Sequence, residues 1–481
     1  MGSAPSRAER QVKGEDAASA RRPPDPSPRP RRAAAIALTV ALALGLAALF
    51  WEGAARQGRH VNTDPTRVDQ DAYLNDARRM RESRYTATGY RNRMPIYPFL
   101  QSLIDRPDLA QPERFERGKL FNTALAMLLL AALFAVLRLR LATLQAATVT
   151  LIAAFTVFVY RAPYVQAELL YYVLSFLSSL LLLEVILHPR VGVSILAGVA
   201  AAAAHLTKAA MLPGLALFVC AMLALSSWCL LRRREARGFL HLAIVVGSFL
   251  IVVYPYISTS KKVFGRWFYN VNTTFYMWYD THEQVMTGTR VHGDREGWPE
   301  LPPEQIPTMS RYFREHSPSQ ILSRVTSGLL KAHRAAMRSY GYYKFVLLFA
   351  GFAALALVLR EFGEIAARSR APQKPRAGPE RARHLAAALF AAGWIGGYLI
   401  LVAWVSATNP GITRLSLQVF LPLMAVLSWL AARGDDVAPR LGLAGRRVTL
   451  SQMFSIAMLA LLGVDVYFSL SHRLMTMFAG D

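Results

Sequence analysis

The stretch AAAIALTVALALGLAALFW, residues 33–51, contains no charged side chain and no proline. A helix needs about 20 apolar residues to cross the hydrocarbon core of a bilayer, and this run supplies them. A secretory signal peptide is the alternative interpretation. However, the region before this run is too long for a signal peptide, and the apolar core is too long and uninterrupted. The stretch therefore predicts an uncleaved first membrane span.

Similar apolar runs recur along the whole chain. The 481 residues are 53% hydrophobic and 18% charged, with a mean hydropathy of +0.26, which is too apolar for a soluble globular domain. We predict an all-α, polytopic transmembrane helical bundle of about 11 spans. These lie near residues 33–51, 120–137, 142–160, 167–187, 191–207, 209–230, 238–256, 343–360, 385–406, 415–432 and 449–469. The polar residue Lys208 separates the short fifth apolar run from the sixth. The two runs form either a hairpin or one long helix with a re-entrant piece.

Basic residues predict the orientation of these spans. The formal net charge is +24. With a cytoplasmic N-terminus, every short inside segment carries arginine, as the positive-inside bias requires. Those segments are 138–141, 188–190, 231–238, 360–384 and 433–447. The positive charge is thus explained by membrane orientation, and no nucleic-acid partner is needed.

Three parts follow from this topology. Residues 1–32, rich in Arg, Pro, Ser and Ala, predict a disordered basic cytoplasmic tail. Residues 33–432 form the main membrane module, with two long extracytoplasmic loops, 52–118 and 257–341, that carry surface helices. Residues 433–481 form a cytoplasmic linker and the last span. The first loop is rich in arginine, but loops of more than about 60 residues are exempt from the positive-inside rule.

The polar segment VDQDAYLNDARRMRESRYTATGYRNRMPIYPFL, residues 68–100, contrasts with its apolar surroundings. Its apolar side chains recur at the spacing of one helix face, at Tyr73, Leu74, Ala77 and Met80. Arginines toward the end of this helix complement its dipole, and an amphipathic helix on the membrane surface explains them. Pro95 and Pro98 then predict a rigid elbow and a second short helix.

Two carboxylates at the start of this helix leave two interpretations open. Asp69 and Asp71 follow a membrane span directly and can cap the helix. A carboxylate held at a membrane boundary can instead serve as a general base or hold a divalent cation, because partial desolvation raises its proton affinity. An Asp-x-Asp pair alone does not separate these roles.

Three motifs, taken in order, resemble one family. The first is an acidic D-x-D-A-Y element followed by a basic residue and P-x-Y-P, at Asp69, Asp71, Tyr73, Arg93, Pro95, Tyr97 and Pro98. The second is the small-residue segment AGVAAAAAHLTKAAMLPGLAL, residues 197–217, with its Leu206, Thr207 and Lys208. The third is TRLSLQVFLPLMAVLSWLA, residues 413–431, with Arg414 and Pro422.

Their order and topology resemble the GT-C-type integral membrane glycosyltransferases. The resemblance is to the branch that includes the protein O-mannosyltransferases and the aminoarabinose transferase of lipid A, and it covers residues 33–432. It implies transfer of a sugar from a polyprenyl-phosphate carrier to a lipid, polysaccharide or protein acceptor at the outer face of the membrane.

The resemblance also implies roles for individual residues. Asp71, with Asp69 as its substitute, is the expected general base for the acceptor hydroxyl. Fixed cations stabilise the charge that builds on a leaving phosphate. The predicted substrate- and phosphate-binding residues are Arg91, Arg93, Tyr97, Glu168, Lys208 and Arg414. Glu168 is expected to orient Lys208 or an arginine. Lys208 between two apolar helices is costly unless paired or functional, and snorkelling to the interface is its alternative role.

No cofactor is fixed by these patterns, and a divalent metal ion is the one candidate. It would join Asp69 or Asp71 to second-loop residues chosen from His282, Glu283, His292 and Asp294. These histidines lack a recognisable ligand spacing, so no metal ligand is assigned.

The second long loop is rich in aromatic residues: Trp267, Phe268, Tyr269, Phe275, Tyr276, Trp278 and Tyr279. An interfacial aromatic belt is the ordinary explanation, and a platform for a sugar ring or prenyl chain is the alternative. The Pro-rich end of the loop is a candidate lid.

Two other classes of protein remain open at this point. A transporter or flippase of lipid-linked saccharides would need ionisable groups at mid-membrane and a repeat between halves. The sequence shows no internal repeat, and apart from Glu184 and His205 the spans are nearly free of charge. A non-catalytic scaffold would tolerate loss of Asp71 and Lys208. Heavy use of alanine and arginine, together with the lack of secretory-pathway signals, favours a bacterial inner membrane as the location.

Overall fold

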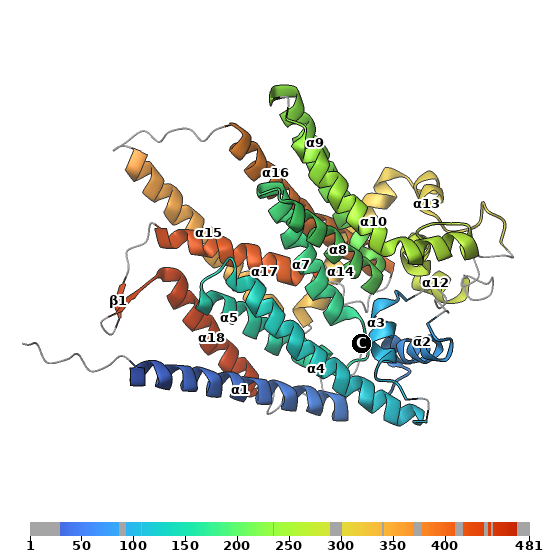
Figure 1. Cartoon of the computed structure of the whole chain (residues 1–481), viewed down its shortest axis with the longest axis horizontal. Coiled ribbons are helices and arrows are strands. Elements are labelled where there is room, and N and C mark those ends of the chain that lie inside the picture. The colour runs from blue at the N-terminus through green and yellow to red at the C-terminus, as the bar shows by residue number, and fades with distance from the viewer. Residues whose placement is uncertain are drawn as a thin grey trace, which may run out of the picture. The chain divides into compact units, whose positions relative to one another are not determined.

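The computed structural model describes residues 29–85, 93–106, 108–233, 235–288, 301–338, 341–368, 378–408, 417–436, 441–443 and 446–468. Figure 1 shows that these residues are almost entirely helical. By contacts between Cα atoms the chain divides into residues 1–49 and 50–481, and the arrangement described below is that of the second unit.

Ten helices among the described residues are long and apolar enough to cross a membrane. They are α1 (Arg29–His60), α4 (Gln111–Arg138), the continuous run α5 (Thr143–Ala153), η2 (Ala154–Phe158) and α6 (Val159–Arg161), α7 (Glu168–Leu187), α9 (Leu212–Arg233), α10 (Arg237–Phe264), α15 (Tyr342–Arg368), α16 (Gly378–Thr408), α17 (Leu417–Ala432) and α18 (Leu450–Phe468). The chain is a polytopic membrane helical bundle, as predicted. The η2 segment is π-helical, which the sequence pattern did not indicate.

The fifth predicted span is a shorter helix, α8 (Val191–Thr207), of 17 residues. It ends at Lys208, whose backbone is extended (φ −154°, ψ 129°), and a 3-10 turn η3 (Ala209–Met211) then leads into α9. Residues 191–233 are therefore two separate helices and not one long helix. α8 packs against α7 and α10.

The two long loops carry short helices, as predicted. The first contains η1 (Arg67–Asp69), α2 (Gln70–Glu82) and α3 (Ile96–Ser102); the second contains α11 (Val271–Thr274), η4 (Tyr276–Trp278), α12 (His282–Gly288), α13 (Met309–Glu315) and α14 (Pro318–Arg338). The predicted apolar face of α2 is buried at Tyr73, Leu74 and Ala77. Figure 1 shows α2, α3, α12 and α13 gathered at one end of the long helices.

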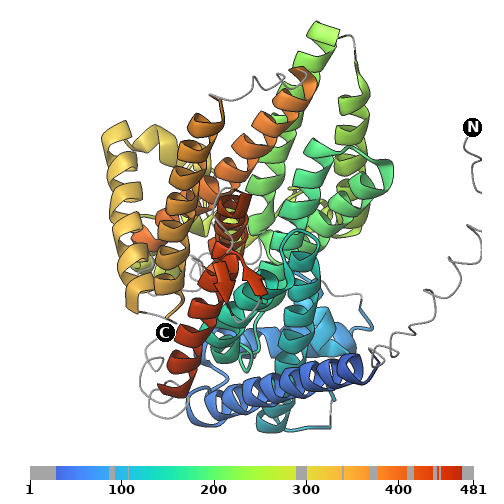
Figure 2. The ribbon, with the colours of Figure 1, turned by 90° about the vertical axis from the view of Figure 1, so that its left-hand side faces the viewer.

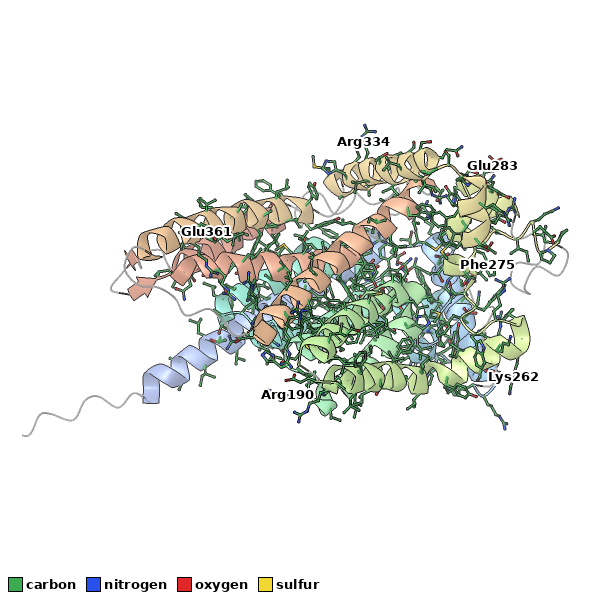
Figure 3. The ribbon with its side chains drawn as sticks, turned by 90° about the horizontal axis from the view of Figure 1, so that it is seen from above. Arg190, Lys262, Phe275, Glu283, Arg334 and Glu361 are labelled. Atoms are coloured by element: carbon green, nitrogen blue, oxygen red, sulfur yellow. The ribbon has the colours of Figure 1, made fainter. Side chains whose placement is uncertain are left out.

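The opposite end carries a small β-hairpin, which the all-α prediction did not include. β1 (Leu441–Leu443) pairs antiparallel with β2 (Arg446–Val448), with Leu441 opposite Val448. This hairpin is in front in Figure 2. Figure 3 places Lys262, Phe275 and Glu283 toward one end and Arg190 and Glu361 toward the other. The first three belong to the end that carries the loop helices.

α14 packs along α16 at very close range. A Cβ atom added at Gly328 would lie 1.8 Å from the backbone oxygen of Ala403. Small residues permit such close approaches between helices, because no side chain keeps the two backbones apart. Gly328 therefore sets the distance between α14 and α16.

Replacing Gly328 with valine is expected to lower the free energy of unfolding by about 1–3 kcal/mol, the cost of overpacking a filled interface. Thermal unfolding of the purified protein in detergent would measure this. Gly351→Ala in α15 is the matched control, because nothing lies within 4 Å of its added Cβ. That control should leave the unfolding temperature unchanged or raise it slightly, since alanine favours helix over glycine. Equal effects of both variants would contradict the role of Gly328.

Candidate functional site

The start of α2 is a strained turn held by buried amides. Val68 and Asp69 both have positive φ, 49° and 70°, which is unfavourable for non-glycine residues and especially for a β-branched one. Gln70 and Asn62 exchange two side-chain hydrogen bonds of 2.7 and 2.8 Å. The backbone N–H of Val165 also donates to Gln70 Oε1 at 2.9 Å, and Asn62 Nδ2 donates to the oxygen of Pro163 at 2.9 Å. This network fixes the turn against the segment that follows α6.

The turn presents Asp69 to an arginine of the same loop. Arg93 NH2 lies 2.8 Å from Asp69 Oδ1, with exposed side-chain fractions of 13% and 47%. The guanidinium carbon of Arg93 also lies 5.4 Å from the ring centre of Tyr73, within cation–π range. Arg93 Nε is buried and has no hydrogen-bond partner among the described residues.

Asp71 contacts other residues. Gln111 Nε2 donates to Asp71 Oδ1 at 2.7 Å, and Asn75 Nδ2 donates to Oδ2 at 2.9 Å. Both oxygens thus accept from amides on α2 and at the start of α4. The structure brings Asp69, rather than Asp71, into the contact with Arg93.

Tyr97 lies at the centre of a buried hydrogen-bond chain. Its side chain is fully buried, its hydroxyl donates to Asn122 Oδ1 at 2.9 Å, and Gln101 Nε2 donates to that hydroxyl at 2.9 Å. Asn122 Nδ2 in turn donates to the backbone oxygens of Ala162 and Tyr164. Burial raises the pKa of Tyr97 well above its usual value, and the hydrogen bond from Gln101 opposes that shift. The phenol is neutral and already satisfied, so Tyr97 joins α3 to α4 in this arrangement.

Replacing Tyr97 with phenylalanine is expected to cost about 1–3 kcal/mol of stability, because Asn122 and Gln101 each lose a buried partner. The raised pKa of Tyr97 means that its hydrogen bonds are fully present below the unfolded-state pKa of about 10 and are lost only as the pH rises further. The stability difference should therefore be constant from about pH 6 to pH 9. Thermal unfolding across that interval would measure it, and a difference that varies within it would contradict this assignment.

The second ion pair joins α7 to the break after α8. Lys208 Nζ lies 3.1 Å from Glu168 Oε1, with exposed side-chain fractions of 25% and 5%. The extended backbone at Lys208 separates two apolar helices, and Glu168 is the first residue of α7. The sequence-based prediction that Glu168 orients Lys208 agrees with this contact.

The elements that carry the two ion pairs lie near one another. Tyr73, which contacts Arg93, makes an edge-to-face contact with Tyr97 of α3, their ring centres 5.1 Å apart. α3 in turn packs against α8, which Lys208 follows directly. The Asp69–Arg93 pair and the Glu168–Lys208 pair are thus carried by neighbouring elements.

The remaining predicted residues are placed as follows. Arg91, Arg414, His292 and Asp294 lie outside the described residues. His282 and Glu283 belong to α12. Across the described part of the chain, no three His, Cys, Asp or Glu side chains gather closely enough to hold a metal ion. The described residues therefore do not fit a metal centre, and no catalytic step below uses one.

Sequence patterns did not single out the buried polar residues that support this site. Arg114 pairs with Asp105 at 2.6 Å inside the first loop, and Lys119 donates to the backbone oxygens of Gly58 and Asn62. The signal was present in α4, whose first nine residues, QPERFERGK, include five charged side chains although a membrane helix follows. Arg114 and Lys119 are the buried ones among them, and they fasten the loop helices to the spans.

Comparison of the chain with protein-family models, curated proteins and solved structures gave no match.

Proposed function

We propose that this chain is a GT-C-like membrane glycosyltransferase with 11 spans, α8 being the fifth. It moves a sugar from a polyprenyl-phosphate donor to a lipid, polysaccharide or protein acceptor. In this proposal the N-terminus is cytoplasmic, and the end with the loop helices faces the outside of a bacterial inner membrane.

One observation carries the proposal: two carboxylate–cation pairs are carried by elements that pack near one another, since α3 contacts α8. Paired cations next to membrane helices suit a lipid phosphate, whose headgroup lies at that depth. Each cation keeps donors beyond its carboxylate, because a guanidinium offers five N–H groups and an ammonium three.

The residues divide the chemistry between them. The acceptor hydroxyl transfers its proton to Asp69 while its oxygen forms a bond to the anomeric carbon of the sugar. The bond between that carbon and the phosphate oxygen breaks, and the electron pair leaves with the polyprenyl phosphate. Arg93 and Lys208 stabilise the charge that builds on this phosphate. We place Asp69 ahead of Asp71 as the base because Asp69 contacts Arg93 directly.

Lipid mass spectrometry of cells lacking the protein tests this function. Accumulation of one polyprenyl-phosphate sugar in these cells, corrected by the wild type but not by Asp69→Asn/Asp71→Asn at equal expression, is the expected result. The accumulated lipid identifies the sugar. A normal lipid profile in the deletion strain, or full correction by the double variant, would refute the transferase and favour a transporter or a scaffold.

A further inference from the structure

The second loop contains a pocket that the proposed catalytic site does not use. A cavity of about 110 Å³ lies between η4, the start of α12, and α13. Its lining includes Trp278, Tyr279 and Tyr312 as aromatic residues and Asp280, Glu315 and His316 as polar ones. A lining of aromatic side chains with a few converging polar groups is typical of a small-ligand site.

The charges around this pocket are already balanced. Arg311 Nε donates to both oxygens of Glu315, at 2.9 and 3.1 Å. Asp280 Oδ1 lies 3.2 Å from His316 Nε2 and 3.6 Å from the buried Arg324. The pocket therefore offers neither an uncompensated cation to an anion nor an uncompensated carboxylate to a cation.

Its aromatic walls are also rigid and partly occupied. The guanidinium of Arg324 lies 4.8 Å from the ring centre of Tyr312 and 4.2 Å from that of Trp404. Trp278 packs against both rings, and Trp404 Nε1 donates to the oxygen of Met277 at 2.7 Å. Because Arg324 already covers these faces, the cluster does not form an open cage for a cationic ligand.

A neutral, polyhydroxylated ligand fits the aromatic lining of the pocket, its balanced charges and the absence of an open cage for a cation. A sugar ring presents an apolar C–H face to an aromatic side chain, and its hydroxyl groups both donate to carboxylates and accept from guanidinium N–H groups. We propose that this pocket binds a neutral saccharide, and that this saccharide is part of the acceptor. The identification as acceptor rests on the proposed transferase function.

The loop segment that precedes the pocket contacts the residue next to Arg93. Asn270 Nδ2 and the Tyr256 hydroxyl each lie 3.6 Å from the sulfur of Met94. A small hydrophobic core of Tyr269, Val271, Phe275 and Ile306 packs this segment against the residue before Pro307, which lines the pocket. Figure 1 shows that the elements of the two sites, α2 and α3 for the first and α12 and α13 for the second, gather at the same end of the long helices. In this proposal an acceptor held in the pocket approaches the transfer site from the side of the second loop.

Saturation-transfer NMR on the full chain in lipid nanodiscs tests the pocket. Nanodiscs are chosen because maltoside or glucoside detergents would themselves compete for a saccharide site. The probes are the neutral trisaccharides maltotriose, mannotriose, cellotriose and N,N′,N″-triacetylchitotriose, with trigalacturonic acid as the anionic and chitosan trimer as the cationic comparator. We expect at least one neutral trisaccharide to bind more strongly than either charged one.

Variants locate that binding. Trp278→Ala should weaken it at least about tenfold, and Trp278→Phe should retain most of it, because an aromatic ring supplies the stacking contact. Trp267→Ala is the matched control: Trp267 belongs to the same loop but lies outside the pocket, beside Tyr254. Absence of binding by all neutral probes, stronger binding of a charged one, or binding that survives Trp278→Ala would overturn the proposal.

A second titration in the same nanodiscs, with a short-chain polyprenyl phosphate, separates this inference from the proposed function. Its binding should depend on Arg93 and Lys208 and be unaffected by Trp278→Ala. If phosphate binding holds and saccharide binding fails, only the pocket assignment is wrong. If saccharide binding holds and phosphate binding fails, the pocket stands as a saccharide site and the transferase proposal is wrong.

Discussion

Replacing Lys208 with methionine is expected to abolish sugar transfer and also to destabilise the fold. The methionine removes the ammonium that lies 3.1 Å from Glu168, whose side chain is only 5% exposed. Breaking a buried ion pair in this way costs about 3–5 kcal/mol, because the buried carboxylate loses the opposite charge beside it. If Lys208 also binds the donor phosphate, transfer should fall about 10²–10³-fold, the loss that follows removal of one stabilising donor in other enzymes.

The double variant Lys208→Met/Glu168→Gln separates the two effects. It removes both charges and should recover most of the lost unfolding temperature. If Lys208 serves only to neutralise Glu168, transfer should recover together with stability. We expect stability to return while transfer stays low, measured as product formed per folded protein. Lys262→Met is the control, since Lys262 is an exposed residue in the last turn of α10 and should affect neither quantity.

Replacing Asp69 with asparagine is expected to lower kcat about 10²–10⁴-fold, the contribution of a general base. Asparagine is nearly isosteric and still accepts a hydrogen bond from Arg93, so expression and unfolding temperature should change little. Transfer assays at saturating donor would separate kcat from donor binding.

Asp71→Asn is the comparison that decides between the two carboxylates. It disturbs the hydrogen bonds from Gln111 and Asn75, worth about 1 kcal/mol each, and should leave kcat within a few-fold of wild type. A loss of kcat with Asp71→Asn and not with Asp69→Asn would reverse the assignment and restore Asp71 as the base.

The apolar runs predicted the positions of the helices well, because membrane spans need only length and hydropathy to be recognised. Each of the predicted spans contains a helix, and the surface helix over Tyr73 and Leu74 also follows from local periodicity. The β-hairpin was missed since its strands are three residues each, too short for an alternating pattern.

The contacts within the candidate site were less predictable. Glu168 and Lys208 are 40 residues apart, and sequence suggested their contact only because both flank predicted outside turns. The reciprocal hydrogen bonds between Gln70 and Asn62 could not be predicted from the sequence. A buried glutamine cannot be distinguished there from an exposed one. Which of the two carboxylates contacts Arg93 likewise depends on the left-handed backbone at Asp69. A local sequence pattern does not predict that backbone conformation.

The shortness of α8 has a mechanical consequence. Seventeen helical residues span about 26 Å, less than the hydrocarbon thickness of about 30 Å. In the orientation proposed above, the first residue of α8 lies at the inner surface, so α8 ends below the outer one, and the bilayer must thin locally for Lys208 to reach water. A donor phosphate that binds Lys208 would meet it at this thinned part of the bilayer. The thickness of the surrounding membrane would thereby affect the proposed reaction, because a thicker bilayer raises the cost of thinning and places Lys208 farther from the phosphate.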